Sequence, residues 1–208
     1  DLNKLEKTGA IQRVHGGATL GNKSNRDVPL PLREGVNALA KDAIARKAVK
    51  LIKPNDVIFI DASSTAAALV PYLPQNQNLV VITNAVKTAY HLGLRNIRTY
   101  LTGGDMIDNS FSCVGFHAEA LLSQMNPDLC FISCLGMSDK GLLTDTSIEE
   151  TRLRHVVLSR TRQAILMLDS SKIGKEYYFT LSTLEHMDHA LCETELPPKL
   201  ASMVAAKR

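Results

Sequence analysis

Small polar and charged residues follow five apolar segments of this chain, at the point where each segment ends. The apolar segments have strand length, and the polar stretches after them are 61–65, 83–84, 102–105, 135–141 and 169–172. In an open α/β sheet, ligands bind outside the carboxyl ends of the strands. If the strands are parallel, all five stretches emerge at one edge of the sheet. The pattern therefore predicts a small-molecule site built from residues that are far apart in the sequence.

The residue types in these stretches suit a phosphorylated or polyhydroxyl ligand. The hydroxyl side chains of Ser63, Ser64 and Thr65 can open a helix, whose free N–H groups and partial positive charge favour a phosphate. Lys172 adds a positive charge. Carboxylate and amide side chains can hydrogen-bond sugar hydroxyls, and glycines let a ligand approach the backbone closely. The candidate effector-binding residues are Asp61, Ser63, Ser64, Thr65, Thr83, Asn84, Gly103, Gly104, Gly136, Asp139 and Lys172.

Each of these features also has a purely structural interpretation. Ser63 or Ser64 can be only a helix cap, and Asn84 can cap the helix that follows it. The pair 103–104 can form a turn, and Lys172 can be a solvated side chain. Their recurrence at strand ends favours the ligand site. The sequence has no glycine motif for a dinucleotide or ATP, so we expect no such cofactor.

The histidines and cysteines do not indicate a metal site. The six histidines lack ligand spacings such as H-E-x-x-H, and the four cysteines form no C-x-x-C pair. We interpret the cysteines as buried thiols in a reducing cytoplasm. A further charged cluster lies in one helical segment. It forms either a solvated helix face or a rim that closes over the ligand or contacts another subunit, and it consists of Glu149, Glu150, Arg152, Arg154 and Arg160.

Alternating strand and helix patterns must position these residues. Helical periodicity predicts helices over 38–52, 66–73, 85–94, 115–125, 148–160 and 198–206. Apolar runs predict strands over 57–60, 79–83, 97–101, 128–134, 164–168, 177–180 and 189–192. The nearly all-apolar strand 128–134 suits a sheet that is covered on both faces. The alternation indicates an α/β fold, with a Rossmann-like, mainly parallel sheet and helices on both faces.

The totals agree with one α/β domain of ordinary composition. Of the 208 residues, 45% are hydrophobic and 22% charged, and no apolar run approaches the roughly 20 residues that span a bilayer. We therefore expect no membrane partner. The net charge of +3 is too weak to indicate nucleic-acid binding by itself. No signal peptide is visible, and the chain begins at Asp1, which suggests that the natural start lies upstream.

Several motifs in order resemble the DeoR family of bacterial transcriptional regulators, specifically its C-terminal effector-sensing domain. The matching segments are 13–18 (RVHGGA), 56–65 (DVIFIDASST), 81–84 (VITN), 101–104 (LTGG), Gly136 with 141–144 (GLLT), and 168–172 (LDSSK). The family usually has Gly-Thr-Thr where this chain has Ser63, Ser64 and Thr65, a departure that keeps the hydroxyls. Each motif alone is weak, but the ordered set is specific.

The resemblance implies a fold like that of ribose-phosphate isomerases, glucosamine-phosphate deaminases and coenzyme A transferases. It implies that the effector is a phosphorylated sugar or a related metabolite. It also implies that residues 1–18 end a winged helix-turn-helix domain, whose absent recognition helix binds operator DNA. Residues 19–35 would then be a linker and 36–208 the effector-binding domain. A repressor that matches a repeated operator is expected to be a homo-oligomer, either a dimer or a tetramer.

The alternative function is catalysis by a sugar-phosphate isomerase or deaminase of the same fold. Such an enzyme needs a positioned acid and base, and Asp61, Asp139, Asp145 and Glu149 can supply carboxylates. However, 135–139 lacks the denser acidic loop that resemblance to the isomerases would require. The winged helix-turn-helix resemblance also favours a regulator. We therefore expect a cytoplasmic regulator of sugar metabolism without catalytic residues.

Overall fold

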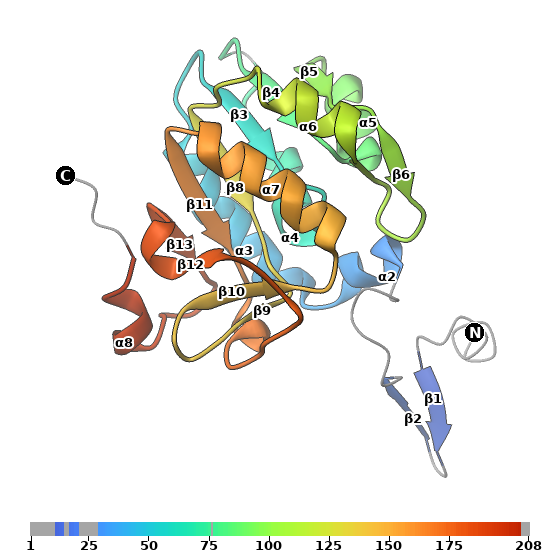
Figure 1. Ribbon diagram of the computed structural model, residues 1–208, viewed down its shortest axis with the longest axis vertical. Helices are drawn as coiled ribbons and strands as arrows, with labels where there is room; N and C mark the ends of the chain where they lie inside the picture. The colour runs from blue at the N-terminus through green and yellow to red at the C-terminus, as the bar shows by residue number, and fades with distance from the viewer. Residues whose placement is uncertain (1–10, 15–16, 21–28, 76, 205–208) are drawn as a thin grey trace.

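Six parallel strands form the central sheet. The computed structural model describes residues 11–14, 17–20, 29–75 and 77–204 (Figure 1). The strands are β3 (Val57–Ile60), β4 (Val80–Thr83), β5 (Arg98–Leu101), β8 (Leu129–Ile132), β11 (Gln163–Met167) and β13 (His189–Leu191). Their order is β13-β11-β8-β3-β4-β5, and every neighbouring pair is parallel. The predicted parallel sheet is confirmed, and the carboxyl ends of its strands lie along one edge.

One face of the sheet is covered by α3 (Ala38–Ala48), α4 (Ser64–Ala67) and α5 (Val86–Leu94). Ile44 of α3 and Leu92 of α5 pack there against fully buried strand residues such as Ile58. Two 3-10 turns, η2 (Val49–Leu51) and η3 (Val70–Tyr72), follow α3 and α4. Each helix therefore buries an apolar stripe against the sheet, as its periodicity predicts.

Helix α4 is shorter than the helix predicted over 66–73, because it ends at Ala67. Pro71 explains the break. A proline has no N–H to donate, and its ring clashes with the carbonyl four residues earlier, which here belongs to Ala67. The chain continues as the 3-10 turn η3 instead.

The opposite face is covered by α6 (Phe116–Leu122), α7 (Ile148–Arg160) and a second, three-stranded sheet (Figure 1). This small sheet contains β9 (Gly136–Met137), β10 (Leu142–Asp145) and β12 (Phe179–Thr183), in the order β12-β10-β9, with antiparallel pairs. The strand predicted at 177–180 is thus real but lies outside the main sheet. In Figure 1 the small sheet lies beside the carboxyl edge of the main one.

A hairpin and a helix were not predicted. The hairpin consists of β6 (Asp105–Ile107) and β7 (Ser112–Val114), between β5 and α6. Helix α2 (Leu30–Gly35) lies in the segment 19–35 that we expected to be a linker. Leu30 is buried, and its N–H donates to the carbonyl of Asn109 in the hairpin turn at 2.8 Å. This part of the expected linker is therefore packed on the sensor.

The two ends of the chain are described in part. At the N-terminal end, β1 (Ile11–Val14) and β2 (Gly17–Leu20) pair as an antiparallel hairpin. Residues 1–10, 15 and 16 of the predicted winged domain and 21–28 of the predicted linker lie outside the described residues, so both boundaries stay predictions. Near the other end, η5 (Leu184–His186) precedes β13, and the last described helix is α8 (Pro198–Ala201). Within 11–14, 17–20, 29–75 and 77–204, no helix combines the length and apolar character needed to cross a bilayer.

Candidate functional site

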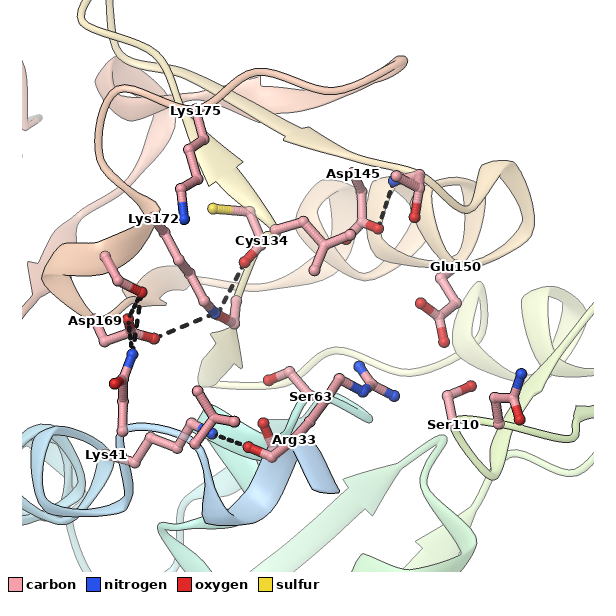
Figure 2. A pocket seen from close by; sticks show the side chains of 18 of the residues that line it. Arg33, Lys41, Ser63, Ser110, Cys134, Asp145, Glu150, Asp169, Lys172 and Lys175 are labelled. Atoms are coloured by element: carbon pink, nitrogen blue, oxygen red, sulfur yellow. Dashed lines mark hydrogen bonds and ion pairs between the residues drawn. The ribbon is translucent and has the colours of Figure 1, made fainter. Parts of the chain in front are cut away.

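A cavity opens at the carboxyl edge of the main sheet (Figure 2). Its walls come from the ends of β3, β8 and β11, from α2 and α3, from the β6–β7 turn and from the start of α7. The lining residues are Arg33, Val36, Asn37, Lys41, Ser63, Ser64, Ile107, Asn109, Ser110, Ser133, Cys134, Leu135, Asp145, Thr146, Glu150, Arg154, Asp169, Ser171, Lys172 and Lys175. Segments separated by more than a hundred residues thus meet at one site, but only three of the five predicted stretches, 61–65, 135–141 and 169–172, contribute residues to it.

Lys172 is fixed where three strand ends meet. It lies in the 3-10 turn η4 (Ser170–Lys172) that follows β11. Its Nζ donates to Ser133 Oγ at 2.8 Å and to Thr65 Oγ1 at 3.3 Å. Asp169 Oδ2 is 3.9 Å away, which is a long ion pair. The two hydroxyls that hold the ammonium carry no charge, and the Asp169 carboxylate is at the limit of ion-pair distance, so the Lys172 side chain on the cavity wall has no close counter-ion among the described residues.

Lys41 is a second lysine of the cavity, and the sequence analysis did not select it. It is 6% exposed, and its Nζ donates to the backbone carbonyl of Arg33. Burial and the nearby charge of Lys172 lower the pKa of Lys41 to about 8. A bound anion would oppose both effects, because it stabilises the charged form of each lysine.

Asp169 links the start of α3 to η4. Its Oδ1 accepts hydrogen bonds from Asn37 Nδ2, at 2.9 Å, and from Ser171 Oγ. Burial alone would raise the pKa of Asp169, but the Ser171 hydrogen bond and the charge of Lys172 lower it. This carboxylate therefore stays ionised and holds the two segments that carry the cavity lysines.

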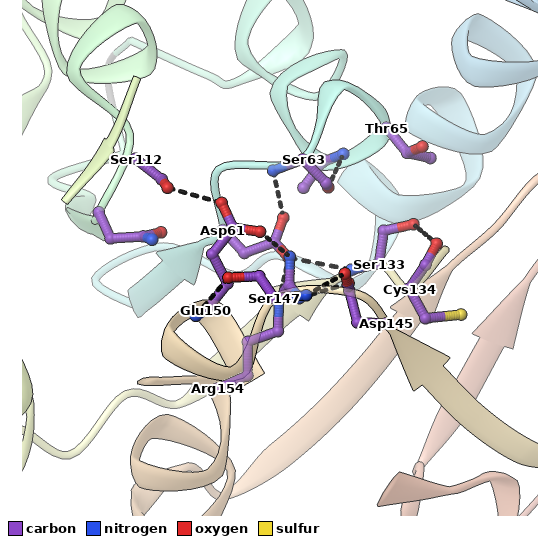
Figure 3. A network of polar contacts seen from close by, with 12 residues as sticks. Asp61, Ser63, Thr65, Ser112, Ser133, Cys134, Asp145, Ser147, Glu150 and Arg154 are labelled. Carbon is purple, nitrogen blue, oxygen red and sulfur yellow. Dashed lines mark hydrogen bonds and ion pairs between the residues drawn. The ribbon is translucent and has the colours of Figure 1, made fainter. Parts of the chain in front are cut away.

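A buried ion-pair network forms the floor of the cavity (Figure 3), and Asp145, Glu150 and Arg154 of this network also line the cavity. Asp61, at the end of β3, accepts from the backbone N–H of Ser63 at 2.8 Å and of Ser133 at 3.2 Å. It also accepts from Arg154 Nε of α7 at 3.0 Å. Arg154 Nη1 contacts Asp145 Oδ2 at 2.7 Å. Burial would lower the pKa of Arg154, but Asp145 and Asp61 raise it well above its usual value.

The network continues to the β6–β7 hairpin. Glu150 of α7 lies 3.8 Å from Arg154 and accepts from Ser112 Oγ at 2.6 Å. Ser112 in turn is 2.8 Å from Ser110 Oγ, on the cavity wall. Polar contacts therefore join the hairpin, α7 and the ends of β3 and β8. In the described part of the chain, no group of three or more histidine, cysteine or acidic side chains is arranged to hold a metal ion.

The structure brings only some of the predicted site residues to the cavity. Ser63, Ser64 and Lys172 line it. Ser63 is also the cap of α4, since its Oγ accepts from the N–H of Ala66 at 3.0 Å. Thr65 is buried behind the wall and holds Lys172. Asp61 is 1% exposed, is not on the wall, and belongs to the floor.

The two predicted residues that end and follow β4, Thr83 and Asn84, use their side chains to hydrogen-bond backbone groups. Thr83 Oγ1 donates to the carbonyl of Ile60 at 2.7 Å and accepts from the N–H of Ala85 at 3.1 Å. Asn84 Nδ2 donates to the carbonyl of Cys113 at 3.3 Å, so it ties β4 to the hairpin. The N-cap of α5 is Ala85, which excludes Asn84 as the cap of that helix. Neither Thr83 nor Asn84 lines the cavity.

The predicted glycines and Asp139 also lie away from the cavity wall. Gly103 and Gly104 have φ values of 65° and 103°, and a Cβ on Gly104 would lie 2.4 Å from the carbonyl oxygen of Val114. At Gly136 the close neighbour is the carbonyl of Lys175, at 2.5 Å from a would-be Cβ, rather than open space for a ligand. Asp139 is exposed in the β9–β10 turn. These four residues serve turns and backbone packing.

A signal for two of the missed residues was present in the sequence. Lys41 is in register with the buried residues Ile44 and Ala48 on one face of α3, and Arg154 lies between buried Thr151 and Val157 in α7. A charged residue on an apolar helix face is almost never fully buried unless it is paired. That rule marks both as candidates. It also separates Arg154 from its exposed neighbours in the charged cluster of α7.

Comparison with known families identifies the chain. Residues 36–193 match the sequence model of the DeoR C-terminal sensor domain. The chain belongs to the DeoR family. This confirms the resemblance that the motifs predict, and it places the cavity inside the matched domain, apart from Arg33.

Three similar DeoR-type proteins are transcriptional regulators. The regulator GolR of Listeria innocua is 36% identical over 197 residues, which cover 94% of this chain and 78% of GolR. The L-fucose operon activator of Haemophilus influenzae is 31% identical, covering 96% of this chain and 80% of the activator. The glycerol-3-phosphate regulon repressor of Escherichia coli is 28% identical, covering 98% and 80%. This DeoR-family chain is therefore a transcriptional regulator with a sensor domain, and the alternative of an enzyme is not supported.

Solved structures confirm the fold class. Ribose 5-phosphate isomerase A of Methanocaldococcus jannaschii superposes with a TM-score of 0.50 at 18% identity, over 66% of this chain and 55% of the isomerase. The eIF2B delta subunit of Chaetomium thermophilum gives 0.57 at 13% identity, over 79% of this chain and 59% of the subunit. At such identities the likeness shows the fold alone, which is the predicted isomerase-like α/β fold.

Proposed function

We propose that this DeoR-family regulator senses a phosphorylated sugar or a related anionic metabolite in the cavity at the carboxyl edge. Binding of this effector would change the affinity of the regulator for operator DNA, which a winged helix-turn-helix domain contacts. Allosteric coupling of about 1–3 kcal/mol changes an affinity about 5–150-fold. We further propose that the regulator acts in the cytoplasm as a dimer or tetramer.

The observation that carries this proposal is that two lysines which are not exposed, Lys41 and Lys172, line one cavity, where the exposed Lys175 adds a third. Lys41 and Lys172 come from different elements, and the charge of Lys172 raises the electrostatic cost of charging Lys41. Folding places them together although, among the described residues, no carboxylate lies closer to Lys172 Nζ than Asp169 Oδ2, at 3.9 Å. A phosphate, with charge-assisted hydrogen bonds to both, would offset that cost. The hydroxyls of Ser63 and Ser64 add neutral donors.

The far side of the cavity suits the sugar rather than the phosphate. In Figure 2, Glu150 and Ser110 lie across the cavity from Lys172 and Asp169. The carboxylate of Glu150 would repel a phosphate but accepts hydrogen bonds from sugar hydroxyls, and the Ser110 hydroxyl can bond to the same groups. We therefore retain Ser63, Ser64 and Lys172 as effector contacts and add Lys41. The other predicted residues are assigned to the scaffold.

A binding screen tests this function. Phosphorylated sugars, each beside its unphosphorylated counterpart, are tested by thermal shift and calorimetry. A specific ligand at one hundred times its dissociation constant stabilises the protein by about 2.7 kcal/mol. Preference for the phosphorylated form is expected. Equal binding of the two forms, or no binding by any phosphorylated sugar, would contradict the proposal.

Variants locate the phosphate. Lys172→Ala and Ser64→Ala should each lower the affinity for the phosphorylated ligand. Loss of a charge-assisted hydrogen bond costs about 1.5–3 kcal/mol, or roughly ten- to a hundred-fold in affinity. Lys50→Ala, at an exposed lysine of η2, is the matched control and should bind as the parent does. Unchanged affinity in both test variants would place the phosphate elsewhere.

A further inference from the structure

Helix α2 reaches the cavity although it precedes the segment that matches the sensor domain, which begins at residue 36. It is anchored there by Leu30, which is buried and hydrogen-bonded to Asn109 in the β6–β7 turn. In the chain, α2 follows the β1–β2 hairpin (Figure 1). It is therefore the described helix through which the N-terminal part of the chain joins the sensor.

The side chain of Arg33 is the contact between α2 and the cavity. Figure 2 shows it reaching into the space between Ser63 and Glu150. Its Nε is buried and has no hydrogen-bond partner among the described residues. Among the charged groups around Arg33, Glu150 has the largest electrostatic effect on it. Glu150 already accepts a hydrogen bond from Ser112 and lies 3.8 Å from Arg154. A buried donor without an acceptor is costly, so this guanidinium suits an anion that the cavity would receive.

The backbone of Arg33 is tied to the same charged group. Its carbonyl accepts the hydrogen bond from Lys41 Nζ, and Lys41 and Lys172 line the same cavity. Three cations from α2, α3 and η4 therefore border one space. An anion held by the two lysines would lie at the cavity wall that Arg33 completes. One planar guanidinium group can bind two phosphate oxygens at once through its fork of N–H donors, and a lysine ammonium lacks this geometry.

We propose that Arg33 is an effector contact, and that the effector's anionic group fixes α2 on the cavity by pairing with this side chain. The inference rests on the proposed function, because it needs an anion beside Lys41 and Lys172. It goes further by naming the helix through which binding reaches the N-terminal part of the chain. In the free protein, α2 is held by the Leu30 hydrogen bond and by the partly exposed ion pair between Glu34 and Lys87.

Amide hydrogen exchange tests this coupling on the 208-residue chain. The probe is inorganic phosphate, compared with chloride at equal ionic strength and pH. Peptides that cover 29–37 report on α2, and peptides that cover 63–67 and 170–173 report on the rest of the cavity. Phosphate should slow amide exchange in all three groups of peptides. In 29–37 the rate should fall by about five-fold or more, which corresponds to the lower end of typical allosteric coupling.

Substitution of Arg33 separates its role from that of the lysines. Arg33→Met keeps the length of the side chain and removes its charge. It should lower phosphate affinity by about ten-fold, as expected for one charge-assisted hydrogen bond, and abolish the slowing in 29–37 at saturating phosphate. Slowing in 63–67 and 170–173 should persist. Arg33→Lys should restore part of the effect. The control Arg162→Met, at an arginine whose side chain is 80% exposed, should behave as the parent.

The outcomes distinguish this inference from the proposed function. Slowing in 63–67 and 170–173 without any in 29–37 would overturn the coupling and leave the anion site intact. Persistent slowing in 29–37 for Arg33→Met would likewise overturn the coupling. If phosphate slows no cavity peptide, the inference is wrong, while the sugar-phosphate screen decides the proposed function separately.

Discussion

Replacing Arg154 by methionine should destabilise the protein far more than replacing an exposed arginine of the same helix, α7. Arg154 pairs with Asp61 at 3.0 Å and with Asp145 at 2.7 Å, and these three side chains are 1–6% exposed. Methionine fills much of the same volume but leaves two carboxylates buried without a cation. Breaking a buried ion pair by removing one partner costs about 3–5 kcal/mol. Total stabilities of about 5–15 kcal/mol are typical, so the loss is a large share.

Urea unfolding followed by circular dichroism measures this loss. The free energy of unfolding should fall by about 3–5 kcal/mol, with an unchanged m-value. The control is Arg152→Met on the same helix. Arg152 is 65% exposed and lies 3.4 Å from Glu119, so its loss should cost under about 1 kcal/mol. The difference between the two arginines tests burial and not the mere presence of an ion pair.

A double-mutant cycle sharpens the test. Asp145→Asn alone leaves Arg154 paired with Asp61. If Arg154 and Asp145 act as one network, the double variant should lose less than the sum of the single losses, with an interaction energy of about 0.5–3 kcal/mol. A loss under about 1 kcal/mol for Arg154→Met, or strict additivity in the cycle, would refute the reasoning.

Three further outcomes follow from the structure. The affinity for inorganic phosphate should fall by up to about ten-fold per pH unit once the pH exceeds the pKa of Lys41, about 8, and Lys41→Arg should remove that fall. The stability of the free protein should change in the opposite direction. Between pH 8 and 10.5 the unfolded chain holds more protons than the folded one, so the free energy of unfolding should rise with pH. Gly136→Ala places a Cβ 2.5 Å from a backbone carbonyl and should cost about 1–3 kcal/mol in urea unfolding, whereas Gly93→Ala, with nothing within 4 Å, should gain about 0.5–1 kcal/mol. Cys130 and Cys134 should resist iodoacetamide at neutral pH in the folded chain, as mass spectrometry can show, because burial raises the pKa of both thiols, that of Cys134 to about 12; fast labelling of either would contradict their burial.

Much of the main sheet was predictable because its strands and helices alternate with different periods. Helix α7 shows this well, since its observed bounds equal the predicted 148–160. Its start is marked by Ser147, whose Oγ accepts from the N–H of Glu150 at 3.2 Å. A local cap and a local periodicity fix such a helix. The β6–β7 hairpin escaped prediction because its turn depends on Phe111 at φ 51°, a residue that rarely signals a turn.

The small sheet was not predictable for a different reason. Its strand β9 has two residues, and β10 pairs with β12 across more than thirty residues of intervening chain. Strands this short carry little pattern, and their pairing is decided by tertiary packing. The same limit applies to Gly136, which was chosen for a ligand but makes room for the backbone of Lys175.

The candidate site was only partly predictable because the strand-end rule selects an edge and not an individual side chain. Polar residues at that edge have two tasks. Some face the cavity, as Ser64 and Lys172 do, and others satisfy backbone groups, as Thr83 does. Sequence position alone does not separate these tasks. Arg33 and Lys41 come from elements before the first strand of the main sheet, so the rule could not reach them.

The anion preference that we propose for the cavity depends on how the fold divides its charges. Acidic and basic side chains occur near the same edge, and a random arrangement would pair them with one another. Here Arg154 pairs with the buried carboxylates of Asp61 and Asp145, and the neutral side chains of Asn37 and Ser171 donate hydrogen bonds to Asp169. The lysines on the wall are thereby left to a ligand. A single buried arginine thus both braces the strand ends and pairs with the carboxylates of Asp61 and Asp145, which leaves the cavity lysines to the anionic effector that we propose.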